Sequence, residues 1–201
     1  DRYQALKRLA DANPEIFSVI FCRTKRDTQK VAEQLIEDGY SAGALHGDLS
    51  QNQRDVVMKS FRAKQIQMLV ATDVAARGID IKNVDLVIQF DPPRDVDTYV
   101  HRSGRTGRAQ TAGVSVLMFG PNQQRDIVRI ERDLGHGFQF VLSGPPSTTS
   151  VLKAAAKTSA VASLEIPDET VEYFKESAAA LLQSDNAEEV AASRRYMAAV
   201  R

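Results

Sequence analysis

The sequence predicts an α/β fold, in which a parallel sheet is flanked by helices and is followed by a small all-α extension. From residue 17 onward, short β-rich runs alternate with stretches of helical periodicity. The runs at 68–71 and 86–88 are apolar throughout, as strands are when helices cover both faces of a parallel sheet. After Leu134 the strand-like runs give way to an Ala-rich helical pattern.

The alternating segments follow one another in a βαβ rhythm. The expected strands, in chain order, are Phe17–Cys22, Ser41–Leu45, Gln67–Ala71, Asp85–Phe90 and Val114–Phe119. The expected helices between and after them are Lys25–Asp38, Gln51–Ala63, Asp95–Arg102 and Asn122–Leu134.

A Gly-Pro-Pro linker at 143–150 divides the chain into two predicted domains, residues 1–143 and 144–201. Beyond it we expect helices at about 151–162, capped by a residue of Ser147 to Ser150, at about 166–182, and at about 187–200. The extension has six basic and eight acidic residues from 150 to 201, a net charge of −2, so it is poorly suited to bind nucleic acid. Its apolar residues must be buried, either against the first domain or against a second copy of the chain.

Composition excludes several classes of protein and leaves others open. Lys+Arg and Asp+Glu both total 26, so any nucleic-acid binding must come from local charge placement. A single cysteine, Cys22, rules out a disulfide framework within the chain and fits an intracellular setting. No apolar run approaches the roughly 20 residues that span a bilayer, so no membrane partner is expected. The three histidines, His46, His101 and His136, lack metal-ligand spacing, and we expect no metal site.

Three polar segments follow predicted strands, at 23–24, 46–48 and 72–80. Ligands of parallel sheets gather at the carboxyl ends of the strands, so these loops are the expected place for chemistry.

The strongest local signal is His-Arg-Ser-Gly-Arg-Thr-Gly-Arg at 101–108, which follows a predicted helix. Three arginines so close together repel one another unless anions are near, and guanidinium groups match phosphate oxygens. Gly104 and Gly107 allow backbone conformations that could aim the arginines at one point. A solvated basic turn is the alternative when the cluster is considered alone.

Taken together and in order, these segments resemble the C-terminal RecA-like domain of DEAD-box RNA helicases over about residues 15–140. The resemblance rests on Ser18–Thr24, His46–Asp48, Gln51–Arg54, Ala71–Asp80 and His101–Arg108, which match motifs IV, IVa, V and VI. One departure is Ser103, which stands where the family usually has a branched apolar residue. The linker and the residues Glu172-Tyr-Phe-Lys175 are similar to the nucleolar RNA helicase II branch, and also to a bacterial heat-resistant RNA-dependent ATPase in which a like extension dimerises.

The resemblance implies a nucleotide-facing set of residues. Its catalytic members are Arg105, Arg108 and His101, and its nucleotide-binding members are Arg77, Gly78, Asp80 and Arg102. Arg105 and Arg108 are implied to reach the γ-phosphate of ATP as arginine fingers. Asp80 alone could equally be a helix cap or turn residue.

The resemblance also implies an RNA-facing set: Arg23, Thr24, Gly47, Asp48, Gln51, Arg54, Thr72 and Asp73. Gln51 and Arg54 lie on one face of a helix, a pattern that by itself is usually a solvated surface. Contacts of this kind address phosphate and sugar, so they position RNA without reading its sequence.

The sequence contains no P-loop and no Asp-Glu-Ala-Asp. The resemblance therefore implies that ATP with Mg²⁺ needs an N-terminal RecA-like domain of the same polypeptide, and that this chain alone is inactive. Expected partners are RNA, that domain and a second copy of the chain through residues 150–201. The resemblance suggests a nuclear or nucleolar location, with an organelle or the cytoplasm as the alternatives. A non-enzymatic RNA-binding or assembly module and half of a DNA helicase are the alternatives.

Overall fold

The computed structural model describes residues 1–76, 81, 84–107 and 112–164, with side chains of the last helix as far as residue 158. The chain forms two compact units, residues 1–7 with 15–144 and residues 8–14 with 145–201. The helices expected at 166–182 and 187–200 lie outside the described residues.

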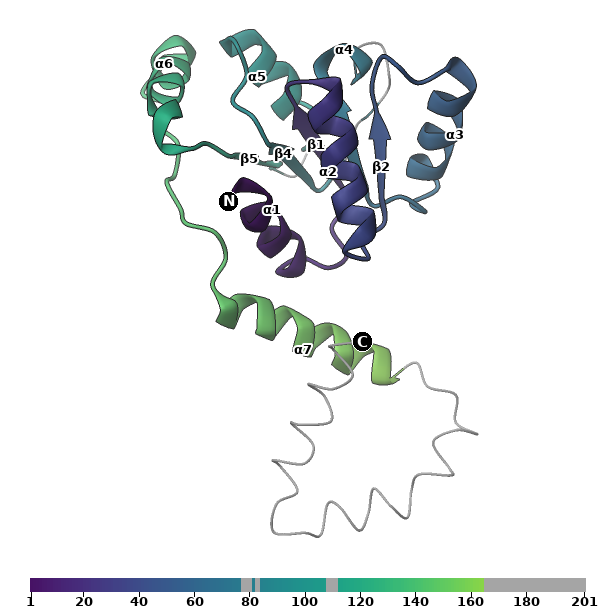
Figure 1. Cartoon of the computed structure of the whole chain (residues 1–201). Coiled ribbons are helices and arrows are strands. Elements are labelled where there is room, and N and C mark those ends of the chain that lie inside the picture. The colour runs from purple at the N-terminus through teal and green to yellow at the C-terminus, as the bar shows by residue number, and fades with distance from the viewer. Residues whose placement is uncertain (77–80, 82–83, 108–111, 165–201) are drawn as a thin grey trace, which may run out of the picture. The chain divides into compact units, whose positions relative to one another are not determined.

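The first unit contains a parallel sheet of five described strands in the order β2-β3-β1-β4-β5 (Figure 1). The strands are β1 (Ser18–Cys22), β2 (Ala42–Leu45), β3 (Met68–Thr72), β4 (Leu86–Gln89) and β5 (Val114–Leu117). All four neighbouring pairs are parallel. The predicted α/β fold class is thus confirmed, and every predicted strand is present with ends shifted by two residues or fewer.

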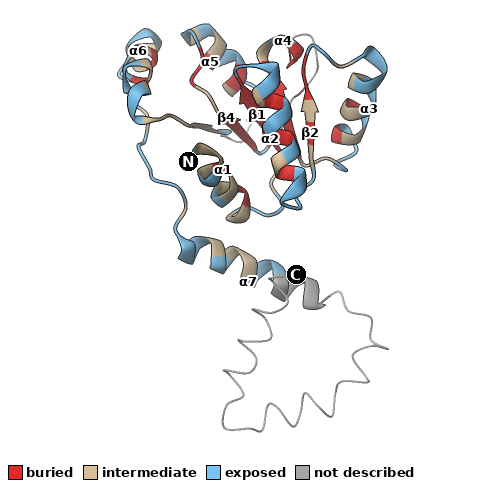
Figure 2. Ribbon diagram, viewed as in Figure 1, coloured by how far each residue is buried: buried red, intermediate tan, exposed pale blue. Residues whose placement is uncertain are grey.

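Burial follows the position of a strand in the sheet (Figure 2). Every residue of β1, β3 and β4 is buried, whereas the edge strands β2 and β5 alternate or are partly exposed. Helices cover both faces of the central strands, so no polar alternation is needed there. At the rim of the core, the rings of Phe17 and Phe61 stack with centroids 4.3 Å apart.

The connecting helices begin where the sequence supplies capping side chains. Thr24 caps α2 (Lys25–Glu37), Ser50 and Gln53 form a capping box on α3 (Gln51–Arg62), and Asp95 caps α5 (Val96–Ser103). Along the sheet, the crossover from β1 to β2 runs in one direction, and the crossovers from β2 to β3 and from β4 to β5 run in the other. Because such crossovers are right-handed, α2 lies on one face of the sheet, and α3 and α5 lie on the other. A short 3₁₀ turn, η1 (Pro121–Gln123), precedes α6 (Gln124–Leu134), where one continuous helix was expected.

Two helices were not predicted. The first, α1 (Arg2–Asp11), precedes the sheet, and within the first unit the Tyr3 hydroxyl and the Lys7 ammonium bind the Asp38 carboxylate at 2.8 and 3.2 Å. These two partners lower the pKa of Asp38 below its ordinary value. The second, α4 (Asp73–Ala76), is one turn that follows β3 directly, where a loop was expected.

The described part of the second unit is dominated by α7 (Thr148–Leu164). It begins three residues before the expected start at Val151, because the Ser147 hydroxyl accepts the backbone N–H of Ser150 at 3.1 Å and so caps the first turn. Leu152 on this helix is half exposed. No described helix is long and apolar enough to cross a bilayer.

Candidate functional site

The strand order brings the three predicted strand-end loops to adjacent positions on one edge of the sheet. Because β2, β3 and β1 are neighbours, the segments 46–48, 72–73 and 23–24 follow three consecutive strands. The chain order β1-β2-β3 alone does not give this arrangement, since β3 inserts between the other two. The edge is the carboxyl edge, where parallel sheets hold ligands.

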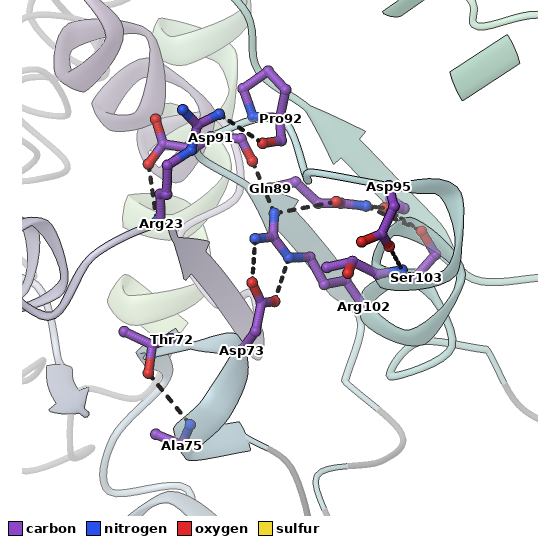
Figure 3. Close-up of polar contacts among 12 residues, drawn as sticks. Arg23, Thr72, Asp73, Ala75, Gln89, Asp91, Pro92, Asp95, Arg102 and Ser103 are labelled. Carbon is purple, nitrogen blue, oxygen red and sulfur yellow. Dashed lines mark hydrogen bonds and ion pairs between the residues drawn. The ribbon is translucent and has the colours of Figure 1, made fainter. Parts of the chain in front are cut away.

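Arg102 forms the centre of a buried polar cluster at this edge (Figure 3). Its side chain is 3% exposed, and Nε and Nη2 donate to the two carboxylate oxygens of Asp73 at 2.6 and 2.8 Å. Nη1 donates to the carbonyl oxygen of Asp91 at 2.8 Å and, at 3.4 Å, to Oε1 of Gln89. The guanidinium carbon lies 5.3 Å from the centre of the Phe21 ring. All three nitrogens are therefore engaged within the chain, and nucleotide contact by Arg102 stays a prediction.

Gln89 extends this cluster away from Arg102. The side chain is fully buried, and its Nε2 donates to the hydroxyl oxygens of Ser103 at 3.1 Å and Ser115 at 3.4 Å. The Ser103 hydroxyl in turn lies 3.2 Å from that of Ser115. Sequence reasoning missed Gln89, because a glutamine at the end of an apolar strand carries no motif.

Asp91 was also missed, although it follows β4 as the predicted site residues follow their own strands. Its carboxylate accepts the backbone N–H of Arg23 at 3.1 Å and forms an ion pair with Arg2. Arg2 also donates to Gln123, and its guanidinium lies 5.5 Å from the centre of the Phe90 ring. The strand-end rule that selected residues 23–24 and 72–73 would have found Asp91.

A hollow of about 220 Å³ opens beside the Arg102 cluster. Its lining residues are Phe21, Asp73, Ala76, Thr98, His101, Arg102 and Arg105. Two of the predicted catalytic residues, His101 and Arg105, thus border the same space. Because Asp73 is paired with Arg102, its charge is offset. Among the described residues no ion pair involves the guanidinium of the half-buried Arg105.

The turn that carries Arg105 is fixed to the sheet by its neighbour Thr106. The Thr106 hydroxyl donates to the carbonyl oxygen of Val84 at 2.7 Å, and the N–H of Val84 donates to the carbonyl of Arg105 at 3.4 Å. Gly107 has φ +89°, a conformation that favours glycine. The turn therefore has a defined backbone path up to Gly107.

Several residues of the predicted RNA-facing set also have structural partners. The Thr24 hydroxyl caps α2 by accepting the N–H of Asp27 at 3.1 Å, and the Thr72 hydroxyl accepts the N–H of Ala75 at 3.3 Å. Arg23 is exposed, and its Nη2 donates to the carbonyl of Pro92 at 3.1 Å.

The loop after β2 contributes a second, more open hollow of about 460 Å³, lined by Lys25, Arg26, Gln29, Lys30, Glu33, His46 and Asp48. The Asp48 carboxylate pairs with the Lys25 ammonium at 2.8 Å, and His46 is buried against Gln29 with ring nitrogen and amide oxygen 2.9 Å apart. Gly47 is exposed, and a Cβ added there would meet nothing within 4 Å. The backbone at Gly47 is thus open to a ligand.

Helix α3 places Gln51 and Arg54 differently. Gln51 is exposed and donates to Asp55 at 2.9 Å. Arg54 is partly buried, its Nη2 donates to the carbonyl of Ala75 at 3.2 Å, and its buried Nε has no partner among the described atoms. Arg54 therefore connects α3 to α4, next to Thr72.

Four predicted site residues, Arg77, Gly78, Asp80 and Arg108, lie outside the described residues. Within the described part of the chain, no group of three or more His, Cys, Asp or Glu side chains is arranged to hold a metal ion.

Cys22 is the last residue of β1, at the carboxyl edge of the sheet, and its side chain is fully buried. Burial, followed by the negative charges of Asp91 and Asp27, raises the pKa of its thiol far above the ordinary value. The thiol is therefore neutral at physiological pH and is not a nucleophile.

Two family models match the chain. Residues 1–110 match the helicase conserved C-terminal domain, and residues 147–193 match the DDX21/DDX50 dimerisation domain. Among curated relatives, nucleolar RNA helicase 2 of Mus musculus is 39% identical over 176 residues, which cover 88% of this chain and 20% of the relative. The chain thus spans about a fifth of the length of that relative.

Solved structures give the same family. A DEAD box protein from the hyperthermophile Methanococcus jannaschii is 44% identical with a TM-score of 0.62, over 65% of this chain and 36% of that one. S. cerevisiae Dbp5 bound to RNA and ADP BeF3 is 30% identical with a TM-score of 0.67, over 77% of this chain and 42% of that one. The chain belongs to the helicase conserved C-terminal domain family, with the RecA-like fold of DEAD-box proteins.

Proposed function

We propose that this chain is the C-terminal half of an ATP-dependent RNA helicase, which supplies arginine fingers and RNA-backbone contacts for local strand separation. One observation carries the proposal: Asp73, a residue of the predicted RNA-facing set, pairs with Arg102 of the predicted nucleotide-facing set. It follows Thr72 of the RNA-facing set, and it lines the hollow that Arg105 borders. A movement of the residues at one site would therefore displace residues at the other, as coupling between ATP and RNA binding requires.

The hollow beside Arg102 suits an anion brought by another domain. Arg105 and His101 border it, and the Asp73 carboxylate is already neutralised by Arg102. A guanidinium there would stabilise the negative charge that develops on the γ-phosphate during hydrolysis. Arg108 is proposed to act as a second finger, and Arg77, Gly78 and Asp80 to bind the nucleotide.

Mg²⁺ needs oxygen ligands, and among the described residues no group of three or more His, Cys, Asp or Glu side chains is arranged to hold it. We infer that Mg²⁺ is held by the triphosphate and by an N-terminal RecA-like domain, which also provides the P-loop. This chain contributes side chains that orient the phosphates and exclude water when the two domains close.

The RNA side consists of the loops after β1, β2 and β3. Gly47 leaves the backbone open, the amides at the start of α3 favour a phosphate, and Arg54 has an unpartnered Nε. Arg23, Thr24, Asp48, Gln51, Thr72 and Asp73 complete the proposed RNA-facing set. The structure of S. cerevisiae Dbp5 bound to RNA and ADP BeF3 supports RNA and nucleotide as joint ligands of this fold.

The test of the finger role is steady-state ATP hydrolysis with saturating RNA by the complete helicase that carries this chain. Arg105→Lys is expected to lower kcat by about 10³-fold, because a lysine cannot reproduce the planar fork of an arginine finger. Arg125→Lys, on the exposed surface of α6, is the matched control and should leave kcat unchanged. Equal kcat values for the two variants would refute the finger assignment.

We propose further that this chain alone hydrolyses no ATP. The expected result is no turnover above a protein-free control, with RNA present. Restoring turnover by adding the N-terminal domain as a separate polypeptide would support the division of the active site between two domains.

We propose that residues 1–143 and 144–201 are separate domains, and that the second makes the protein a homodimer. The match of residues 147–193 to a dimerisation domain and the half-exposed Leu152 on α7 support this. Sedimentation equilibrium over a wide concentration range should give a dimer for the full chain and a monomer for residues 1–143. A monomeric full chain would end the proposal.

The name of the mouse relative supports a nucleolar location.

A further inference from the structure

Gln89, Ser103 and Ser115 form a hydrogen-bonded cluster at the end of α5. The turn that follows α5 carries Arg105 and is called the arginine turn. No feature of the DEAD-box resemblance accounts for the cluster. Ser103 is the residue at which the sequence departs from the usual branched apolar side chain. In the structure its hydroxyl accepts from Gln89 Nε2 at 3.1 Å and bonds to Ser115 at 3.2 Å. The departure therefore has a specific partner.

The chemistry of Gln89 explains why a hydroxyl is needed at position 103. A carboxamide has two N–H donors and an acceptor oxygen, and Gln89 is fully buried. Its donors go to Ser103 and Ser115, and its oxygen accepts from Arg102. A branched apolar residue at 103 would remove the acceptor of one Gln89 N–H and leave that buried amide only the longer bond to Ser115. Leaving a buried donor poorly paired lowers the stability of the fold.

The same contacts connect Gln89 to the arginines. Ser103 is the last residue of α5, next to Arg102 and two residues before Arg105. The Gln89 side chain thus lies between the end of α5 and the guanidinium of Arg102 (Figure 3). Ser115 on β5 completes the arrangement, because its hydroxyl lies within hydrogen-bond distance of both Gln89 Nε2 and the Ser103 hydroxyl.

We propose that Ser103 is a positioning residue for the arginine turn: its hydroxyl, through Gln89 and Ser115, fixes the end of α5 and the orientation of the Arg102 guanidinium. Arg102 and the adjoining turn then present Arg105 to the hollow in one orientation. The catalytic part of this inference rests on the proposed finger role of Arg105, whereas the orientation of Arg102 does not.

Threonine and valine at position 103 provide a matched pair. The two side chains have the same shape and β-branching, but only threonine keeps the hydroxyl. In the 201-residue chain, NMR detection of the Arg102 Nε–H, assigned by its loss in Arg102→Lys, reports on the bond to Asp73. Ser103→Val should accelerate solvent exchange of this proton, and Ser103→Thr should leave it as in the parent. Equal exchange in the two variants would overturn the inference.

In the complete helicase, Ser103→Val should lower kcat by about tenfold to 100-fold with KM for ATP little changed, because a finger misplaced by about 1 Å loses that much. Ser103→Thr should retain kcat. The double variant Gln89→Leu with Ser103→Val removes the buried amide together with the Ser103 hydroxyl that accepts from it, so its Tm should recover toward that of the parent while kcat stays low. A purely structural role predicts that kcat recovers with Tm, and that result would refute positioning.

Arg105→Lys, measured beside these variants, separates the two proposals. If Arg105→Lys retains full kcat, the finger role fails, and the exchange of the Arg102 proton still decides the orientation of Arg102. If Arg105→Lys is inactive while the Val and Thr variants have equal kcat, the positioning of Arg105 is refuted and the finger role stands.

Discussion

Arg102 of α5 and Asp73 of α4 are joined by two hydrogen bonds of 2.6 and 2.8 Å, although 28 residues separate them in the chain. The arginine is buried and the carboxylate is partly exposed. The pair fastens the helix that carries the arginine turn to the end of β3, so it connects the two halves of the proposed site.

Replacement of Asp73 tests the strength of this connection. Asp73→Ala leaves a buried guanidinium without its carboxylate, and we expect the free energy of unfolding to fall by about 3 kcal/mol. Urea unfolding of the 201-residue chain measures it. Asp133→Ala, which removes an exposed carboxylate from α6, is the control and should change stability by less than about 0.5 kcal/mol. Equal losses would show that the Arg102 pair does not stabilise the fold.

Gly113 lies against the arginine turn, and a Cβ added there would sit 2.6 Å from Thr106 Cγ2 and 2.7 Å from the Thr106 carbonyl carbon. Gly113→Ala must displace backbone, so we expect a loss of about 1–3 kcal/mol. Gly120→Ala is the matched control, since the nearest atom to its new Cβ is 3.7 Å away. Thermal unfolding of both variants, with NMR shifts of the Thr106 amide, checks the expectation. An unperturbed Thr106 in Gly113→Ala would contradict it.

Arg2 connects α1 to the carboxyl edge through Asp91 and Gln123. Charge-assisted hydrogen bonds that are partly buried contribute more than exposed ones, so Arg2→Ala should lower stability by about 2 kcal/mol. Arg8→Ala on the same helix removes an exposed guanidinium and should cost less than about 0.5 kcal/mol. Urea midpoints at constant slope compare the two, and similar midpoints would count against a role for Arg2.

The raised pKa of Cys22 predicts a pH dependence with a definite sign. An unfolded cysteine ionises near pH 8.5, about where free thiols titrate, whereas the folded chain keeps the proton to higher pH. The contribution of Cys22 to stability is therefore fully present below the unfolded pKa and is lost as the pH rises above it. Urea unfolding between pH 7 and 10 should show this loss in the parent chain and a weaker one in Cys22→Ala.

Thiol labelling checks the same residue by a second route. At pH 8 the folded chain should react with a disulfide reagent far more slowly than the chain in denaturing urea, because Cys22 is buried and protonated. Fast labelling of the folded chain would contradict this assignment.

Sequence patterns located most elements because local rules decided them. The apolar runs at 68–71 and 86–88 became fully buried strands, and Ser50 and Asp95 cap helices. They did not locate α4, because a single turn held by the Thr72 hydroxyl has no periodicity to detect. Nor did they locate Gln89 and Asp91, whose importance depends on contacts with residues distant in the chain.

The sequence by itself determined the α/β alternation, the strand-end placement of the polar loops and the arginine turn at 101–108, since hydrophobic periodicity and glycine positions are local properties. Only the tertiary structure decided that β3 inserts between β2 and β1, that Asp73 pairs with Arg102, and that the Ser103 hydroxyl accepts a hydrogen bond from Gln89. These contacts join segments separated by up to tens of residues, and their geometry follows from strand order and close packing, which no local pattern encodes.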